Sequence, residues 1–376
     1  LIKKLRAGEF DEKMLQANIN NFKLYELQSM ESNEGRADIF VNSFINGTNW
    51  EDEVTAIDRM AKLTKEDIVA FADKYLKEDN YAVVYKKQGK DPNEKKMTKP
   101  EITPIVSNRD VASPFLTSIQ ENAVRPIEPV FLDFKKDMSQ LTAKSDIPVL
   151  YKQNTTNDLF QLIYVFDMGN NNDKALGTAF DYLEYLGTSD MTPEELKSEF
   201  YRLACTFYVS PGNERTYVVL SGLNENMPAA MQLFEKLLAD AQVNKEAYNN
   251  LVGDILKARA DAKLNQGQNF SRLMNYAMYG PKSPATNLLT EAELASMNPQ
   301  ELVDRIHNQN NYKHRILYYG PSSSKDLLAT IDQYHQVPAT LKDIPAGNEF
   351  SYLETPATKV LVAPYEAKQI YMAQIS

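Results

Sequence analysis

The stretch Phe180–Leu223 limits the fold more than any other part of the chain, because clear helix and strand patterns follow one another within it. Thr192, Pro193 and Glu195 have the types and spacing of an N-cap, a first-turn proline and a capping-box acid. They predict a helix that begins at Pro193. An earlier helix with one buried face is predicted by apolar residues at helical spacing, which are Leu176, Ala179, Phe180, Leu183 and Leu186.

Two strands are predicted directly after these helices. The segments CTFYVS (205–210) and TYVVLSGL (216–223) carry apolar side chains and flank the sequence Pro211-Gly212-Asn213, which is typical of a strand–turn–strand unit. Helical runs that alternate with strand pairs favour an α+β fold. We expect duplicated units, each with an antiparallel or mixed sheet and helices packed mainly on one face.

An internal repeat supports the idea of duplicated units. Before residue 91 the sequence predicts a helix capped by Asp11, a helix near 37–44, a helix capped by Thr64 and a strand at 80–85. The same order returns with a helix capped by Asn244, a helix after 265–267, a helix capped by Asn298 and a strand at 314–319. Residues 265–267 stand where 33–35 stand in the first copy. The offset is 232 residues at Asn33 and Asn265, and 234 at Leu63 and Met297. A near-constant offset indicates duplication, and the alternative is a chance similarity of common helix–strand patterns.

The repeat and the prolines predict the domain organisation. Seven of the 18 prolines lie between Pro92 and Pro148, so residues 88–146 are predicted to be an extended linker. Residues 1–87 are then the C-terminal part of one unit, 147–338 a complete unit, and 339–376 a linker with the first strands of a further unit, at 359–361 and 370–371. Since the chain begins at Leu1 inside a predicted helix, we expect it to be part of a longer protein.

Composition excludes several classes of partner. The net charge of −10 and the pI near 5.1 argue against a nucleic-acid groove, which needs a basic surface. No apolar run approaches the ~20 residues of a membrane span. The single cysteine, Cys205, is expected to be a small buried apolar residue rather than a reactive thiol. The composition is compatible with a bacterial periplasm or cell envelope and equally with the cytoplasm.

The order of elements around the first stretch resembles a known family. A helix that ends in Leu186-Gly187-Thr188, a second helix with Arg202-Leu203-Ala204-Cys205 and two strands are similar to the pitrilysin/insulinase family of zinc metallopeptidases. In that family the first helix carries His-x-x-Glu-His, in which two histidines bind zinc and the glutamate activates water. Two registers align this chain with the motif, and neither supplies a histidine: Asp181, Glu184 and Tyr185, or Thr178, Asp181 and Tyr182.

No other residues replace the missing ligands. The three histidines, His307, His314 and His335, do not have the spacing of a zinc motif, and each is predicted to be a solvated or capping residue. The family's further glutamate ligand is matched most nearly by Asp254, which we interpret as a solvated helix residue. We therefore predict no catalytic residue and no metal ligand in this chain. Substrate-binding residues stay unassigned, and Arg215 and Tyr217 are interpreted as a solvated turn residue and a packed strand residue.

The resemblance implies a function for the whole protein. It implies a four-domain clamshell hydrolase, a zinc protease whose metal site lies upstream of Leu1, with this chain as an inactive peptidase domain. Residues 88–146 would then be a hinge, although a plain surface connection is an equal alternative. This part would help to enclose and bind a peptide or an unfolded protein beside the catalytic domain, and family sheet edges accept peptides by strand addition. The alternatives are a non-catalytic structural or protein-binding subunit, and an unrelated α+β binding protein.

Overall fold

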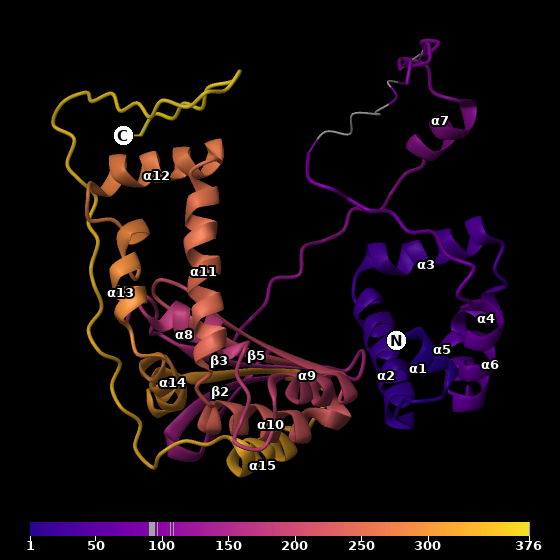
Figure 1. Ribbon diagram of the computed structural model, residues 1–376, viewed down its shortest axis with the longest axis horizontal. Coiled ribbons are helices and arrows are strands. Elements are labelled where there is room, and N and C mark those ends of the chain that lie inside the picture. Colours follow the sequence, from indigo (N-terminus) through magenta and orange to yellow (C-terminus); the bar gives the residue numbers. More distant parts are fainter. Residues whose placement is uncertain (90–94, 96, 106, 108, 376) are drawn as a thin grey trace.

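A computed structural model of the chain describes residues 1–89, 95, 97–105, 107 and 109–375. Residues 90–94, 96, 106 and 108 of the predicted linker lie outside the described residues, as does residue 376. The N-terminal helices and the unit around the sheet form separate bodies that meet at one side (Figure 1). The helices are α1 (Ile2–Arg6), α2 (Glu12–Ser29), α3 (Asn33–Asn46), α4 (Trp50–Val54), α5 (Ala56–Met60), α6 (Lys65–Tyr75), α7 (Pro114–Gln120), α8 (Leu176–Leu183), α9 (Pro193–Arg202), α10 (Met227–Asp240), α11 (Lys245–Ala262), α12 (Gln266–Tyr279), α13 (Glu291–Ser296), α14 (Pro299–Asn308) and α15 (Ser324–Tyr334).

One sheet organises the second half of the chain. Its strands have the order β1-β2-β6-β3-β5-β4, and the β2–β6 pair is parallel while the other pairs are antiparallel. The strands are β1 (Ser139–Ala143), β2 (Ile147–Gln153), β3 (Leu159–Phe166), β4 (Cys205–Pro211), β5 (Thr216–Leu223) and β6 (Arg315–Gly320). Short 3₁₀ turns lie at Lys144–Asp146 between β1 and β2, at Asn224–Asn226 between β5 and α10, at Pro284–Thr286 between α12 and α13, and at Gln309–Asn311 between α14 and β6.

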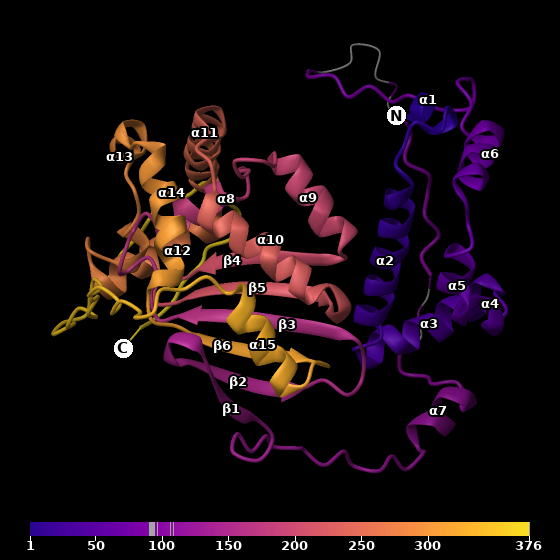
Figure 2. The same ribbon diagram turned by 90° about the horizontal axis from the view of Figure 1, so that it is seen from below.

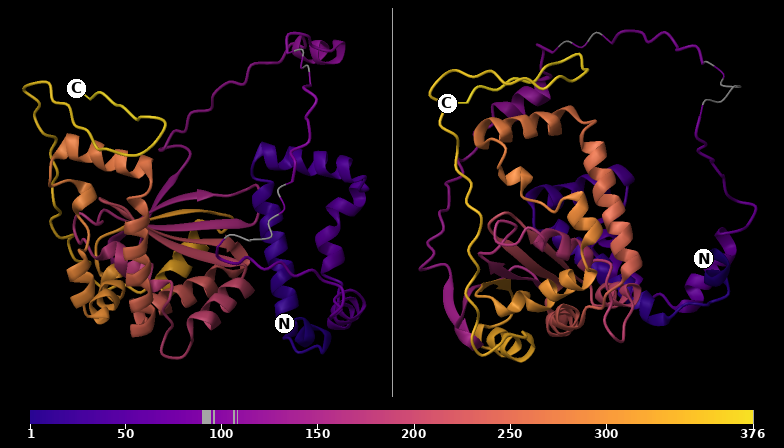
Figure 3. Two further views of the ribbon diagram at one scale, coloured as in Figure 1. Left: turned by 45° about the horizontal axis from the view of Figure 1, so that its top comes forward. Right: turned by 60° about the vertical axis from the view of Figure 1, so that its left-hand side comes forward.

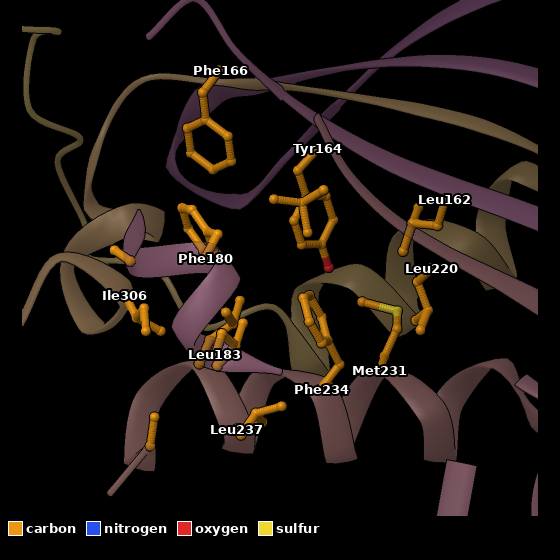
Figure 4. Close-up of a cluster of buried hydrophobic side chains, with 14 of the residues drawn as sticks. Leu162, Tyr164, Phe166, Phe180, Leu183, Leu220, Met231, Phe234, Leu237 and Ile306 are labelled. Atoms are coloured by element: carbon orange, nitrogen blue, oxygen red, sulfur yellow. The ribbon is translucent and has the colours of Figure 1, made fainter. Parts of the chain in front are cut away.

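Helices cover one face of this sheet, and α8, α9, α10, α14 and α15 lie on the same side (Figures 2 and 3). The predicted α+β class with a mixed sheet is therefore confirmed. The main core forms between the sheet and these helices, and each large apolar side chain fully buried there stabilises the fold by about 2 kcal/mol. Side chains of β3 point toward α8 and α10 across this core (Figure 4), and those that meet are Leu162, Tyr164, Phe166, Phe180, Leu183, Phe234 and Leu237.

The repeat of helices is visible in the structure. Helices α2 and α11 both have 18 residues, and α3 and α12 both have 14. Each pair forms an L-shaped arm (Figure 1). The starts of α2 and α11, and of α3 and α12, are 233 residues apart, and those of α6 and α14 are 234 apart. Each of these helices has an N-cap side chain that accepts a backbone N–H, in the pairs Asp11/Asn244, Ser32/Asn265 and Thr64/Asn298.

The strand predicted at 80–85 is not formed. Residues 81–87 have no regular secondary structure, and Val84 is 92% exposed. With the offset of 234, this segment corresponds to β6, which is held between β2 and β3 in the complete unit. A strand needs neighbours for its backbone hydrogen bonds. The described residues before 87 include no strand that could pair with this segment. Residues 80–85 therefore have the sequence pattern of a strand but no partner strand.

The strands predicted at 359–361 and 370–371 are likewise absent. The C-terminal segment instead runs along the outside of the unit and passes over α12 (Figure 3). It is attached there by a hydrogen bond from Leu353 N to Met278 O (2.7 Å) and by stacking of Tyr352 on Tyr279. The apolar and aromatic side chains of this segment thus contact α12, although its backbone does not pair as a strand.

Among its described residues, the predicted linker 88–146 contains α7, β1 and the 3₁₀ turn Lys144–Asp146. Helix α7 begins after Ser113, whose hydroxyl accepts a hydrogen bond from Leu116 N. Strand β1 lies inside the predicted linker and pairs with β2, although its sequence SQLTA shows little apolar alternation. The sequence pattern missed β1 because an edge strand with one neighbour needs few buried side chains. None of the described helices is long and apolar enough to cross a bilayer.

Candidate functional site

The helix α8 carries the positions that the family resemblance assigns to a zinc motif. In one register the positions are Asp181 of α8 and Glu184 and Tyr185, which directly follow the helix, and all three are exposed. Partial desolvation, followed by the neighbouring charge of Glu184, raises the pKa of Asp181. In the other register Tyr182 is fully buried, and its hydroxyl donates to Asn244 O (2.6 Å) and accepts from Asn244 N (2.8 Å). Tyr182 therefore fixes α8 to the start of α11.

The histidines lie elsewhere in the fold. His307 is half-buried, and its Nε2 contacts Ala241 O at the end of α10 (3.1 Å), as expected for a capping residue. His335 is the C-cap residue of α15, which agrees with the predicted capping role. Neither His335 nor His314 is solvated, because both are buried and their Nε2 atoms are 2.8 Å apart. Asp254 is exposed on α11. Among the described residues, no three His, Cys, Asp or Glu side chains are grouped so as to hold a metal ion.

A polar hollow lies at the turn between β4 and β5, with a volume of about 880 Å³. Asp167 joins two arginines there, with Arg215 Nε at 2.8 Å and Arg315 at 2.6 Å. The hydrogen bond from Arg315, and then that from Arg215, lowers the pKa of Asp167 against the effect of partial burial. Tyr217, which is 38% exposed, also lines the hollow. Arg215 is thus paired across the turn rather than simply solvated.

An apolar groove lies on the other side of β4. It has a volume of about 420 Å³ and is bounded by α2, α8, α9 and β4. Most of its lining is apolar or aromatic, and its polar members are Asn21, Gln28, Glu184, Lys197 and Thr206. The side chains that contribute its apolar wall include Leu24, Leu183, Leu196, Phe200 and Phe207.

Strand β4 is an edge strand of the described sheet, and its free backbone groups face away from β5. Two bonds set the alternation: Leu223 N donates to Ala204 O (3.2 Å), and Gly212 N donates to Arg215 O (2.7 Å). Partners in an antiparallel pair alternate between hydrogen-bonded and non-hydrogen-bonded. The even-numbered residues of β4 therefore bond to β5. The N–H and C=O groups of Cys205, Phe207 and Val209 point to the open edge.

The residues whose backbone groups point to the open edge also contribute their side chains to the groove. Cys205 is buried and Phe207, Val209 and Pro211 are half-buried, and the first three of these residues line the groove. Burial raises the pKa of the Cys205 thiol to about 12, so Cys205 is a buried apolar residue, as predicted, and not a nucleophile. The groove thus combines free backbone donors and acceptors with an apolar floor, which is the arrangement that strand addition requires.

The opposite wall of the groove comes from α2, far away in the sequence. Asn21 Nδ2 donates to Tyr201 O (2.6 Å), and Tyr201 Oη donates to Asn18 Oδ1 (2.7 Å). Leu24 packs with Leu159 and with other residues at the start of β4 and the end of β5. Since α2 belongs to the first segment and β4 to the second, sequence patterns could not predict this wall. The alternation of β4 was visible in the sequence, but its edge position was not.

The comparisons with known proteins concern the fold as a whole. The structure is similar to that of the periplasmic protease PqqL from Escherichia coli, with 12% identity, a TM-score of 0.51 and 91% of this chain covered. It is also similar to a mutant of the ferredoxin protease FusC in complex with Arabidopsis ferredoxin, with 10% identity, a TM-score of 0.50 and 94% covered. The chain shares its fold with these proteases. The predicted pitrilysin-like fold is thereby confirmed.

The likeness covers less than half of each of these two proteases. The chain spans 42% of the length of each of these two proteases, so their activities do not transfer to it directly. A peptidase M16 inactive domain from Pseudomonas fluorescens aligns with 57% of the chain and 54% of its own length, at 16% identity and a TM-score of 0.48. The chain matches no protein-family model and no curated protein.

Proposed function

We propose that this chain is the non-catalytic portion of a zinc-dependent endopeptidase of the pitrilysin/insulinase type, and that it helps to enclose and bind peptide substrate. The free edge of β4 beside the apolar groove carries the proposal. An extended peptide would pair with Cys205, Phe207 and Val209 as an additional antiparallel or parallel strand. Its alternate side chains would enter the groove between α8, α9 and α2, so peptides with apolar residues at every second position are the preferred ligands.

Zinc chemistry is assigned to another part of the whole protein. The two registers of α8 offer carboxylates and tyrosines but no histidine, whereas a catalytic zinc site takes three protein ligands, commonly histidines and a carboxylate. Zinc content of the whole protein and of this chain, measured side by side by plasma mass spectrometry, tests the assignment. We expect about one zinc in the former and none in the latter. If the whole protein contained no zinc after purification in the presence of zinc, it would instead be a structural or protein-binding subunit.

Backbone pairing can be tested apart from side-chain contacts. In Val209→Pro the outward N–H is lost while the β4–β5 bonds remain, and Pro211 shows that β4 already tolerates proline at an outward-facing position. In Val209→Ala the N–H is retained and only the side chain is shortened. Binding of a fluorescein-labelled ten-residue peptide that alternates valine and threonine would be followed by fluorescence anisotropy.

The loss of one hydrogen bond is worth about 1 kcal/mol, or roughly fivefold in affinity. We expect Val209→Pro to weaken peptide binding by at least that factor relative to Val209→Ala. Equal affinity of the two variants would refute strand addition at β4. The distinction holds even if the shortened side chain itself weakens binding, because both variants lack the valine side chain.

We also propose a bacterial periplasm or cell envelope as the location of the whole protein. The similarity of its fold to that of a periplasmic protease supports this location. Cell fractionation with an antibody against the chain tests it, and recovery in the cytoplasmic fraction would overturn it.

A further inference from the structure

Helix α3 carries an exposed apolar stripe. Its members have the spacing of one side of a helix, and they are Phe40, Val41, Phe44 and Ile45. Their exposed fractions run from 51% for Val41 to 88% for Phe44. Trp50, the single tryptophan of the chain, stacks on Phe40 with ring centroids 4.6 Å apart and extends the stripe to the start of α4. Contiguous exposed apolar side chains of this kind mark a surface that binds a partner.

The internal repeat gives this stripe a counterpart on α12. Each of the two helices ends at a glycine, Gly47 after α3 and Gly280 after α12, and these glycines are 233 residues apart. A Cβ atom added at Gly280 would lie 3.1 Å from Leu353 Cδ1, whereas no atom of the described residues would lie within 4 Å of one added at Gly47. The segment that follows the second unit therefore covers the end of α12, and the corresponding end of α3 is open.

The segment that covers α12 makes the contact through an aromatic residue followed by a leucine. Tyr352 stacks on Tyr279, the last residue of α12, with ring centroids 4.8 Å apart, and Leu353 follows Tyr352. The same pair of residue types occurs after the first group of helices, as Phe115 and Leu116 of α7. The two pairs are 237 residues apart, close to the 233 of the glycines. By the repeat, α7 stands where the covering segment of α12 stands.

Helix α7 has an apolar side that is also exposed. Phe115, Leu116 and Ile119 lie on one side of its seven residues, and their exposed fractions run from 44% to 75%. No residue of α7 is buried, and the helix stands apart from the other helices (Figure 1). A helix of one or two turns is unstable on its own in water, because its few hydrogen bonds do not offset the cost of nucleation. A stable α7 therefore requires a surface on which to pack.

We propose that α7 packs on the apolar stripe of α3, as the C-terminal segment packs on α12. Leu116 then lies beside Gly47, and Phe115 stacks on Phe44. The stacking partner is Phe44 because Asn46 stands where the last tyrosine of α12 stands. Both surfaces belong to one chain, so the effective concentration of α7 at α3 exceeds that of a free peptide or of a second copy in dilute solution.

Docking of α7 divides the predicted linker into an attached part and a free part. Residues up to 120 are then held by the first helices, and only 121–138 connect them to β1. A fully extended stretch of that length spans at most ~60 Å. Of the two alternatives for the linker, docking thus favours a hinge of limited reach over a plain surface connection.

Residue-resolved amide exchange in the full chain tests the docking. The amides of 117–121 are those that bond within α7 or to its cap residue, and in an undocked helix of this length they exchange almost freely. We expect the wild type to protect them about tenfold or more. The double variant Phe44→Ser, Ile45→Ser should lose this protection, although both substitutions lie about 70 positions away in the sequence. Phe22→Ser removes an exposed aromatic side chain from α2 and, as the matched control, should keep it.

Trp50 provides a reciprocal measurement from the side of α3. A docked α7 shields the stripe, so the double variant Phe115→Ser, Leu116→Ser should raise acrylamide quenching of Trp50 fluorescence about twofold over the wild type. All the substituted side chains are exposed, and far-ultraviolet circular dichroism of each variant verifies that the chain is folded.

Free exchange of 117–121 in the wild type would overturn the proposal, as would equal protection in the wild type and in the α3 variant. Protection that increases with protein concentration would overturn it in favour of a second copy as the partner. Quenching of Trp50 that does not respond to the α7 variant would also overturn it.

Discussion

At Gly222, β5 leaves no room for a side chain beside β4. Gly222 pairs with Cys205 and has φ of +150°, a conformation that residues with a side chain rarely adopt. A Cβ atom added at Gly222 would lie 2.4 Å from Ala204 O and 2.7 Å from both Cys205 Cα and Cys205 Sγ. Since two of these three atoms belong to the backbone, Gly222→Ala forces β4 and β5 apart at the floor of the groove.

The expected destabilisation follows from two contributions. The backbone conformation costs a residue with a Cβ about 1–3 kcal/mol, and relief of the overlap adds a loss of similar size. We predict that Gly222→Ala lowers the free energy of unfolding by about 3 kcal/mol. The same chemical change at Gly253 in α11, where nothing lies within 4 Å of the added Cβ, should raise it by about 1 kcal/mol.

Urea unfolding followed by circular dichroism measures both variants against the wild type. Peptide binding adds a second readout, because a displaced β4 no longer presents its outward groups in register. A loss below about 1 kcal/mol in Gly222→Ala, or a change equal to that of Gly253→Ala, would refute the reasoning.

Three further predictions concern single side chains. Because burial lowers the pKa of His314 in the native state, the unfolded chain binds more protons than the native state between pH 6.5 and about 4. The contribution of neutral His314 to the free energy of unfolding is therefore complete above pH 6.5 and is lost as the pH falls through 4. Over this pH range the free energy of unfolding, measured by urea titration, should fall by about 3 kcal/mol more in the wild type than in His314→Gln. Parallel plots of unfolding free energy against pH for the two proteins would contradict this. Thr192→Ala removes the cap of α9 and should cost about 1 kcal/mol by the same assay, with no change counting against the cap. Leu183→Ala, which empties a buried site between α8 and α10, should cost 2–5 kcal/mol, and a loss below about 1 kcal/mol would mean that the core tolerates the cavity.

Local chemistry made part of the fold predictable. Thr64 and Thr192 were identified from the spacing of a cap and an acid, and both form complete capping boxes. The turn at Gly212 followed from residue type, and the strands on either side pair as expected. These features depend on residues within a few positions of one another, so the sequence contains all that they need.

Features that depend on distant partners were not predictable. The strand pattern at 80–85 is real, but the pattern does not say whether partner strands are present. His335 contacts His314, 21 positions away, and Glu235, 100 positions away, so no spacing rule connects these three residues. One pattern could have indicated their cluster: Glu235 occupies an apolar face of α10 beside Phe234 and Leu238, where an unpaired charge would be costly.

The proposed function depends on a peptide that forms hydrogen bonds with the backbone N–H and C=O groups of Cys205, Phe207 and Val209. Residue-resolved amide exchange, measured by NMR with and without the valine–threonine peptide, tests it most directly. Without peptide, the amides of Phe207 and Val209 should exchange quickly, while those of Thr206 and Tyr208, bonded to β5, should exchange slowly. With saturating peptide, we expect Phe207 and Val209 to become at least tenfold slower. No added protection of Phe207 and Val209 with bound peptide would contradict the account.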